Sequence, residues 1–230
     1  MGESPEMIVD VIIPSLGRPV LTECVASLKY LPFPMKLLVM LNESWPASIN
    51  AALKVTNNDV VIMDDDVRLL PDTFSVLPKY MGHADIFGFK LMFPNGRIQH
   101  AGGILQNGNL GHIGHKQIDI GQFDTPRYMS HLCGGLLYIK RHVFEKVGFM
   151  AEDYPGVSFE DVDFSFRALK AGFKMLYLPY EAIHLESATK ATMDNISELS
   201  QQNYLELKKR HLTEEFTEMA GEYPRVLYED

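Results

Sequence analysis

Val60-Val61-Ile62-Met63-Asp64-Asp65-Asp66 joins an apolar run directly to three acidic residues. The apolar residues predict a buried strand, and the carboxylates follow at the point where that strand emerges. Three adjacent negative charges repel one another, and a divalent cation would relieve the repulsion because hard cations bind carboxylate oxygens. Side chains at i and i+2 of an extended chain point the same way, so we expect Asp64 and Asp66 to face one site while Asp65 turns aside. For the triplet alone, a solvated acidic turn is an equally good interpretation.

Around this stretch, strand-like and helix-like segments alternate through the first half of the chain. We expect strands at residues 8–13, 36–41 and 60–63, and helices at residues 20–31 and 48–55. This alternation is typical of a parallel sheet covered by helices, an α/β fold. Ligands of such sheets bind beyond the carboxyl ends of the strands. The residues that follow the three strands are Pro14 to Arg18, Asn42 and the Asp triplet.

The second half is less regular. We expect strands at residues 84–91 and 175–178, the latter ended by Pro179, helices at 162–171 and 196–211, and a hairpin turn at 94–97. Six glycines between residues 102 and 121 predict a mobile loop over a site. His112 and His115 lie in this segment, and a plain polar loop is preferred there over a metal site. Gly134-Gly135 interrupts an apolar run, which indicates either close approach of a ligand or tight packing.

Composition limits the kind of protein. With 230 residues, 46% hydrophobic and 22% charged, the chain is an ordinary globular protein. It shows no repeat or linker, so one domain over residues 1–230 is expected. A net charge of −9 argues against binding nucleic acid or anionic membranes. Cys24 and Cys133 are expected to be free thiols. No signal peptide or apolar run of about 18 residues is visible, which predicts a cytoplasmic protein without a transmembrane segment.

A second acidic cluster, Phe159-Glu160-Asp161-Val162-Asp163-Phe164, lies where a helix is expected to begin. Aromatic neighbours tend to raise a carboxylate pKa, which suits a general base. Helix capping is a slightly better interpretation of the cluster alone, and Asp163 is spaced to pair with Arg167. A lone His184 is expected to be structural unless the fold brings it near Asp66.

Taken in order, these segments resemble family 2 glycosyltransferases of the GT-A fold, from about residue 8 to about residue 212. The segments that carry the resemblance are VIIPS (11–15) with Arg18, DDD (64–66), PNGRIQHAGG (94–103), GGLLYIKR (134–141), FEDVD (159–163) with Arg167, GF (172–173), Pro179, and His184 with Ser187. The family implies a Rossmann-like, mostly parallel central sheet flanked by helices, with a smaller acceptor-side region. It implies a nucleotide-binding half at about residues 8–100, a sugar and acceptor half at about 101–212, and a C-terminal tail at 213–230.

The resemblance also implies roles for individual residues. Asp66, helped by Asp64, would hold Mn²⁺ or Mg²⁺ on the donor diphosphate, and His184 would complete the metal shell. Asp161 would be the catalytic base, with Glu160 as its catalytic neighbour. The residues implied for nucleotide binding are Pro14, Ser15, Gly17, Arg18, Asn42, Asn50, Asp64 and Asp65. Those implied for the donor sugar or acceptor are Gly134, Gly135, Glu160 and His100.

The expected activity is metal-dependent, inverting transfer of a hexose or deoxyhexose from a nucleoside-diphosphate sugar to a hydroxyl of a glycan or other acceptor. Two departures from the family leave the nucleobase open, with UDP as the default. Leu41 or Asn42 stands where many relatives carry an Asp, and Ile49 stands where an Arg often precedes Asn50. The alternatives are a GT-A domain that binds nucleotide or glycan without turnover, and a nucleotidyltransferase.

Overall fold

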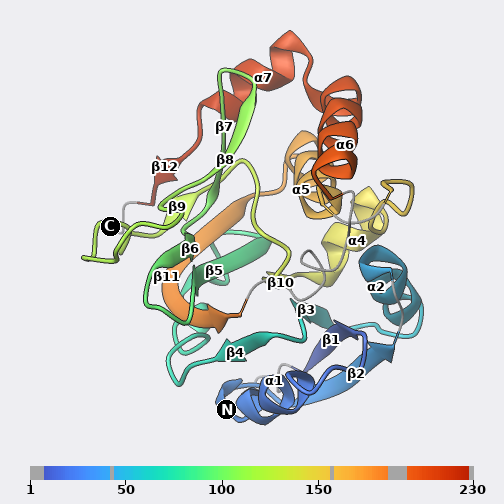
Figure 1. Cartoon of the computed structure of the whole chain (residues 1–230), viewed down its shortest axis with the longest axis vertical. Helices are drawn as coiled ribbons and strands as arrows, with labels where there is room; N and C mark the ends of the chain where they lie inside the picture. The colour runs from blue at the N-terminus through green and yellow to red at the C-terminus, as the bar shows by residue number, and fades with distance from the viewer. Residues whose placement is uncertain (1–7, 42–43, 156–157, 186–195, 228–230) are drawn as a thin grey trace, which may run out of the picture.

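A mixed ten-stranded sheet runs through the molecule, with helices on both of its faces (Figure 1). The computed structural model describes residues 8–41, 44–155, 158–185 and 196–227. The sheet order is β12-β9-β11-β5-β10-β3-β1-β2, with β4 beside β11 and β6 beside β5. The strands are β1 Val9–Ser15, β2 Met35–Leu41, β3 Asp59–Met63, β4 Val67–Leu69, β5 Ile86–Met92, β6 Ile98–His100, β7 Gly103–Gln106, β8 Asn109–His112, β9 Arg127–Tyr128, β10 Leu136–Ile139, β11 Met175–His184 and β12 Arg225–Val226. The helices are α1 Leu21–Ser27, the 3₁₀ turn η1 Leu28–Tyr30, α2 Trp45–Leu53, α3 Leu77–Tyr80, α4 Arg141–Val147, α5 Glu160–Lys170, α6 Ile196–His211 and α7 Glu214–Gly221.

The apolar run at residues 60–63 forms the buried strand β3, as predicted. Its side chains alternate between two cores: Val61 and Met63 pack on the side of α1 and α3, and Val60 and Ile62 on the side of α2, α4 and α5. Both faces of the strand are therefore covered, which is why its sequence is apolar at every position. Strand β1 pairs in parallel with both β2 and β3, as the alternation of elements predicts.

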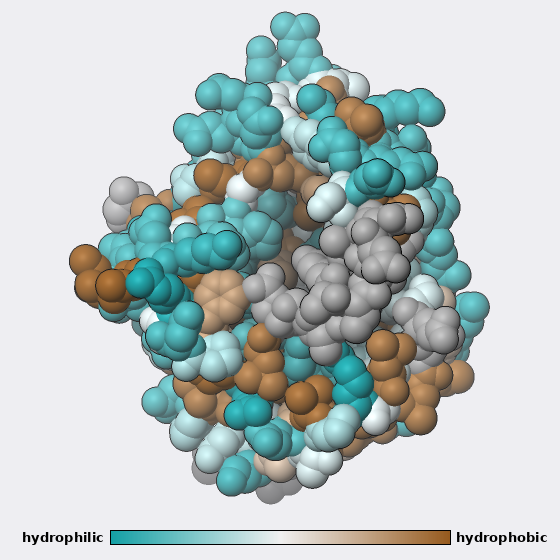
Figure 2. Space-filling view, in the orientation of Figure 1, coloured by the Kyte–Doolittle hydropathy of each residue, from teal (hydrophilic) through white to brown (hydrophobic). Residues whose placement is uncertain are grey.

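Strand β2 is an edge strand and is only partly covered. Met35, Leu37 and Leu41 are 41%, 38% and 72% exposed. Hydrophobic residues are visible at the lower right of Figure 2, where Figure 1 places β2. The strand was predicted correctly, but its apolar composition does not reflect complete burial.

The second half of the chain inserts into the same sheet. Strand β10 lies antiparallel between β3 and β5, and β11 runs parallel to β5. The expected α/β architecture with a Rossmann-like first half is confirmed. Cys24 and Cys133, both described, form no disulfide.

The glycine-rich segment at residues 102–121 is not the loop that its composition predicts. It contains a two-stranded hairpin, β7 with β8, whose turn residues Asn107 and Gly108 have φ of 51° and 72°. Asn-Gly favours this two-residue turn because both positions need positive φ. Beyond the hairpin, the buried Lys90 donates to Asp119 at 2.7 Å and pairs with Asp124. Side-chain and backbone contacts therefore tie the segment to the sheet.

One other prediction was wrong. Strand β11 does not end at Pro179 but continues to His184, with a register shift between Leu178 and Glu181. A bulge tolerates proline because the ladder hydrogen bond is already missing there. The expected C-terminal tail contains α7 and β12. Helix α7 packs through Phe216, which is 4% exposed.

Candidate active site

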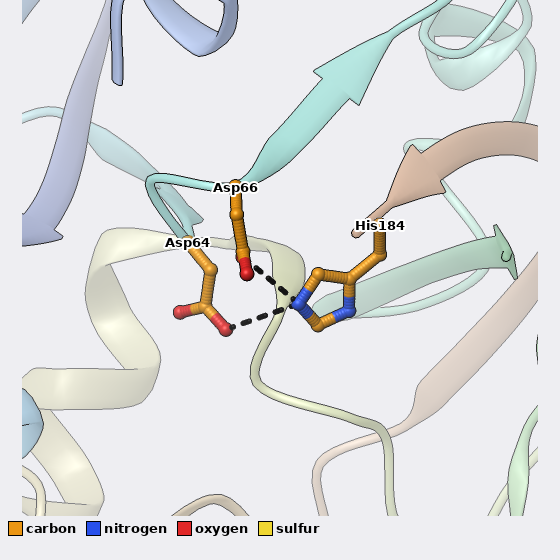
Figure 3. A group of neighbouring side chains, drawn as sticks. All are labelled: Asp64, Asp66 and His184. Atoms are coloured by element: carbon orange, nitrogen blue, oxygen red, sulfur yellow. Dashed lines mark ion pairs between the residues drawn. The ribbon is translucent and has the colours of Figure 1, made fainter. Parts of the chain in front are cut away.

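Three potential metal ligands meet where β3, β4 and β11 come together. The chain leaves β3 at Met63, turns through the Asp triplet, and enters β4, whose Val67 pairs with His184 at the end of β11. His184 Nε2 lies 3.1 Å from Asp66 Oδ1 and 3.8 Å from Asp64 Oδ2 (Figure 3). One atom from each of the three side chains lies within 4.8 Å of the others. The fold therefore brings His184 beside Asp66. His184 was expected to be purely structural unless the two residues were neighbours, and they are neighbours.

Asp65 does not belong to this group, as predicted, although the reason differs: residues 65–66 form a turn, closed by a hydrogen bond from Val67 N to Asp64 O, and not an extended chain. It accepts a 2.6 Å hydrogen bond from Ser15 Oγ and forms an ion pair with Arg18. The amide of Gly17, which has a φ of 73°, donates to Ser15 Oγ at 2.9 Å. Asp65 thus anchors the loop that follows Pro14 at the end of β1. Nucleotide binding by these residues stays a prediction.

The two outer carboxylates of the triplet have different electrostatic environments. Burial raises the pKa of Asp64 to about 6, and the negative charge of Asp66 adds to this while His184 opposes it. Burial also acts to raise the pKa of Asp66, but its hydrogen bond and charge interaction with His184, together with Arg18, lower that pKa overall. The protein alone therefore compensates the negative charge of Asp64 poorly, and a bound cation would stabilise the ionised carboxylate.

Trp45 connects the triplet to the second acidic cluster. Its indole Nε1 donates a 2.7 Å hydrogen bond to Asp64 Oδ1. A Cβ atom on Gly134 would lie 2.9 Å from Trp45 Cζ2 and 3.1 Å from Asp161 Cβ. On Gly135, a Cβ would lie 3.2 Å from His184 Cε1. Tight packing, one of the two interpretations of the glycine pair, is therefore present: Gly134 lies against Trp45 and Asp161, and Gly135 lies against His184.

Both carboxylate oxygens of Asp161 accept backbone N–H groups. Gly134 N donates to Oδ2 and Val162 N donates to Oδ1, each at 2.8 Å. Each carboxylate oxygen has two acceptor sites, so these bonds fix the group without exhausting it. The carboxylate is thus held against Gly134.

Glu160 is 4% exposed and accepts from Ser158 N at 2.8 Å. The residue before it, Phe159, is the N-cap of α5 and makes no side-chain cap hydrogen bond. Ser158 and Phe159 have φ of 112° and 77°, uncommon for residues with a side chain and frequent at functional sites. The acids therefore occupy the first turn of α5 and not its N-cap position, and Asp161 still accepts from Val162 N, a first-turn N–H group. Asp163 pairs with Arg167 at 2.8 Å, as predicted.

Two predicted site residues have other surroundings. Asn50 is 4% exposed, and its amide bonds Met150 N and O at 2.9 Å and Glu152 at 2.6 Å. These bonds occupy the amide with protein partners, and nucleotide binding by Asn50 stays a prediction. Asn42 lies outside the described residues.

His100 is 1% exposed. Its Nδ1 lies 2.8 Å from His112 Nδ1, and its Nε2 accepts from Cys133 N at 3.4 Å. Both ring nitrogens thus have protein partners, and a contact with sugar or acceptor stays a prediction. Within the described part of the chain, the only group of three or more candidate ligands for a metal is Asp64, Asp66 and His184, so His112 and His115 belong to no such group.

The sequence reasoning missed Trp45 and Gln99. Gln99 Oε1 lies 2.7 Å from His184 Nδ1. Two features of the sequence could have pointed to these residues. Trp45 is the only tryptophan and follows the end of a strand, and Gln99 lies in the PNGRIQHAGG segment.

Comparison with known proteins identifies the family. Residues 38–218 match the family model described as "Glycosyltransferase like family 2". The chain therefore belongs to glycosyltransferase family 2. A relative, "Uncharacterized protein y4gI" of Sinorhizobium fredii (strain NBRC 101917 / NGR234), is 30% identical over 162 residues, which cover 66% of this chain and 18% of the relative.

Solved structures share the fold at low identity. GalNAc-T7 with UDP, GalNAc and Mn²⁺ gives a TM-score of 0.63 at 11% identity, over 90% of this chain and 48% of that one. S. aureus TarS 1–349 with UDP-GlcNAc gives 0.60 at 15%, over 94% and 70%. The mannosyltransferase PcManGT from Pyrobaculum calidifontis with GDP-Man and Mn²⁺ gives 0.58 at 13%, over 89% and 65%. The fold of this chain is thus the GT-A glycosyltransferase fold. Within the described ranges, no helix is long and apolar enough to cross a membrane.

Proposed function

We propose that this chain is a metal-dependent, inverting glycosyltransferase that moves a sugar from a nucleoside-diphosphate sugar, by default a UDP-sugar, to a hydroxyl of a glycan or other acceptor. One observation carries the proposal. Asp64, Asp66 and His184 form a potential metal site beside Gly135, and Asp161 is fixed beside the adjacent Gly134. An inverting transfer needs two functions at the donor sugar: charge stabilisation for the leaving group and a base for the attacking hydroxyl.

The ligand set fits Mn²⁺ or Mg²⁺. Two carboxylates provide the oxygen ligands that these cations prefer, and an imidazole is accepted by manganese. The raised pKa of Asp64 is consistent with a group whose negative charge is meant to be balanced by a cation. When bound, the cation would supply the positive charge that neutralises the nucleoside-diphosphate leaving group. The structures of GalNAc-T7 with UDP, GalNAc and Mn²⁺ and of PcManGT with GDP-Man and Mn²⁺ support this proposal by analogy.

The protein groups then have distinct roles. Asp161 takes the proton from the acceptor hydroxyl as the oxygen attacks the anomeric carbon. Its two backbone hydrogen bonds hold the carboxylate in one orientation, which favours a single direction of attack. Attack on the face opposite the leaving group in one displacement inverts the anomeric configuration. The loop from Ser15 to Arg18, anchored by Asp65, borders the nucleotide.

The direct test is binding of nucleotide sugars with and without Mn²⁺. Thermal unfolding of the parent chain is measured with a panel of UDP-, GDP- and dTDP-sugars, with EDTA as the metal-free condition. A ligand at about 100 times its Kd adds about 2.7 kcal/mol. We expect stabilisation by at least one donor only when Mn²⁺ is present.

Asp66→Asn should abolish that metal-dependent stabilisation. Asp72→Asn, at an exposed position of the same half, is the matched control and should behave as the parent. If Asp66→Asn binds the donor in Mn²⁺ as tightly as the parent does, the metal assignment is wrong. Donor binding without transfer to any hydroxyl acceptor in a glycan library would instead indicate a binding domain without turnover.

A further inference from the structure

We propose that Gln99 is a positioning residue that sets the metal-binding form of His184. Gln99 lies in the middle of β6 and is 6% exposed, and its side-chain oxygen is 2.7 Å from His184 Nδ1. The inference rests on the proposed metal site and assigns a role to a residue outside the ligand group. The role of Gln99 would be to determine which ring nitrogen of His184 carries the proton and which is available to a cation.

The chemistry follows from the atoms that face each other. An amide oxygen carries no proton and only accepts hydrogen bonds, so His184 Nδ1 must be the donor. A neutral imidazole has one N–H group, and with that proton on Nδ1 the lone pair lies on Nε2. Nε2 faces Asp66 Oδ1 at 3.1 Å and Asp64 Oδ2 at 3.8 Å. The Nε2 lone pair thus faces the two carboxylates that are the proposed oxygen ligands, where one cation could be shared by all three side chains. Gln99 therefore directs the lone pair of His184 toward the proposed cation site.

Both partners in this hydrogen bond are held in place. The backbone carbonyl of Gln99 lies 3.0 Å from His115 Nδ1, and β6 pairs with β5 on either side of Gln99. The His184 ring is bounded by Gly135, where an added Cβ would come within 3.2 Å of Cε1. His184 as a whole is 8% exposed. Bulk water therefore has little access to replace the Gln99 oxygen if it is removed.

The test compares two substitutions that differ in one property. Gln99→Met keeps the approximate length of the side chain and removes the acceptor, whereas Gln99→Glu keeps an acceptor oxygen. Gln117→Met, at an exposed position, controls for the substitution itself. Mn²⁺ affinity of each full-length variant is measured by calorimetry without donor. In parallel, long-range ¹H–¹⁵N NMR of the His184 ring, with diamagnetic Mg²⁺, reports which nitrogen is protonated.

We expect Gln99→Met to weaken Mn²⁺ binding about 10–100-fold, the usual effect of removing the partner of a metal-ligating His. Gln99→Glu and Gln117→Met should stay within about threefold of the parent, and the parent ring should carry its proton on Nδ1 when Mg²⁺ is bound. Equal affinity of parent and Gln99→Met overturns the inference while leaving the metal site intact. A parent ring protonated on Nε2 in saturating Mg²⁺ overturns it even if Gln99→Met fails to fold. A parent that binds neither cation contradicts the proposed metal site, and the role of Gln99 with it.

Discussion

Replacing Asp64 with Asn should stabilise the metal-free protein, although Asp64 belongs to the proposed metal site. Burial raises the pKa of this carboxyl from 3.8 to about 6, so the folded protein disfavours its ionised form. Asn has the same shape without the charge, and its oxygen can still accept the hydrogen bond that Trp45 donates to Asp64 Oδ1. The substitution therefore removes an unfavourable buried charge while retaining the main contact.

The magnitude follows from the two pKa values. A rise from 3.8 to about 6 corresponds to about 3 kcal/mol against the ionised form at pH 7. The Asp64 side chain is 28% exposed, and solvent screening reduces this cost, so we expect a gain of about 1–3 kcal/mol in the free energy of unfolding.

The stability of the parent protein should decrease with pH in the range where Asp64 loses its proton. Between about pH 4 and pH 6 the folded state holds a proton on Asp64 that the unfolded state has released, so parental stability falls as pH rises through this window. The advantage of Asp64→Asn should be greatest above pH 6, about half as large at pH 5, and absent below about pH 4.

Urea unfolding in EDTA at pH 7.5 and pH 5 measures this difference, with Asp72→Asn as a control expected to stay within about 0.5 kcal/mol of the parent. In Mn²⁺ the order should reverse, because the parent gains binding energy that Asp64→Asn lacks. The reasoning is refuted if Asp64→Asn is less stable than the parent in EDTA at pH 7.5. It is also refuted if the difference between the two proteins is the same at both pH values.

Two further predictions concern Asp161 and its neighbour Gly134. Asp161→Asn should lower turnover by about 10²-fold or more, because general-base catalysis usually contributes a rate factor of this size. Donor affinity, measured by calorimetry, should stay at the parental value. Loss of both turnover and donor affinity would mean that Asp161 is structural or a metal ligand. Gly134→Ala should destabilise the protein by about 1–3 kcal/mol in urea unfolding, because the new Cβ would lie 2.9 Å from Trp45 Cζ2; Gly82→Ala meets no atom within 4 Å and has no positive φ, and an equal loss there would mean that Trp45 is not responsible.

The sequence predicted those parts of the site that depend on local pattern. A β-branched apolar run followed by acids specifies a buried strand and the position where it emerges. The separation of Asp65 from Asp64 and Asp66 was predicted from strand periodicity, but the structure achieves it through a turn at residues 65–66. Parallel strands place their carboxyl ends at one sheet edge, which is why His184 was correctly considered as a neighbour of Asp66.

The remaining features depend on contacts between distant segments, which periodicity does not encode. Gln99 and His184 are 85 residues apart, and Asn50 and Met150 are 100 apart. No local pattern around His184 identifies Gln99, which the structure provides as its hydrogen-bond partner. The β7–β8 hairpin was missed for a different reason: the abundance of glycine outweighed the local Asn107-Gly108 turn signal.

A crystal structure with Mn²⁺ and a nucleoside diphosphate tests the central claim most directly. We expect a cation bound by Asp66 and by His184 Nε2, at a metal–nitrogen distance of roughly 2.0–2.3 Å. A His184 ring nitrogen farther than about 3 Å from the bound cation, or a cation bound away from the Asp triplet, would contradict the account.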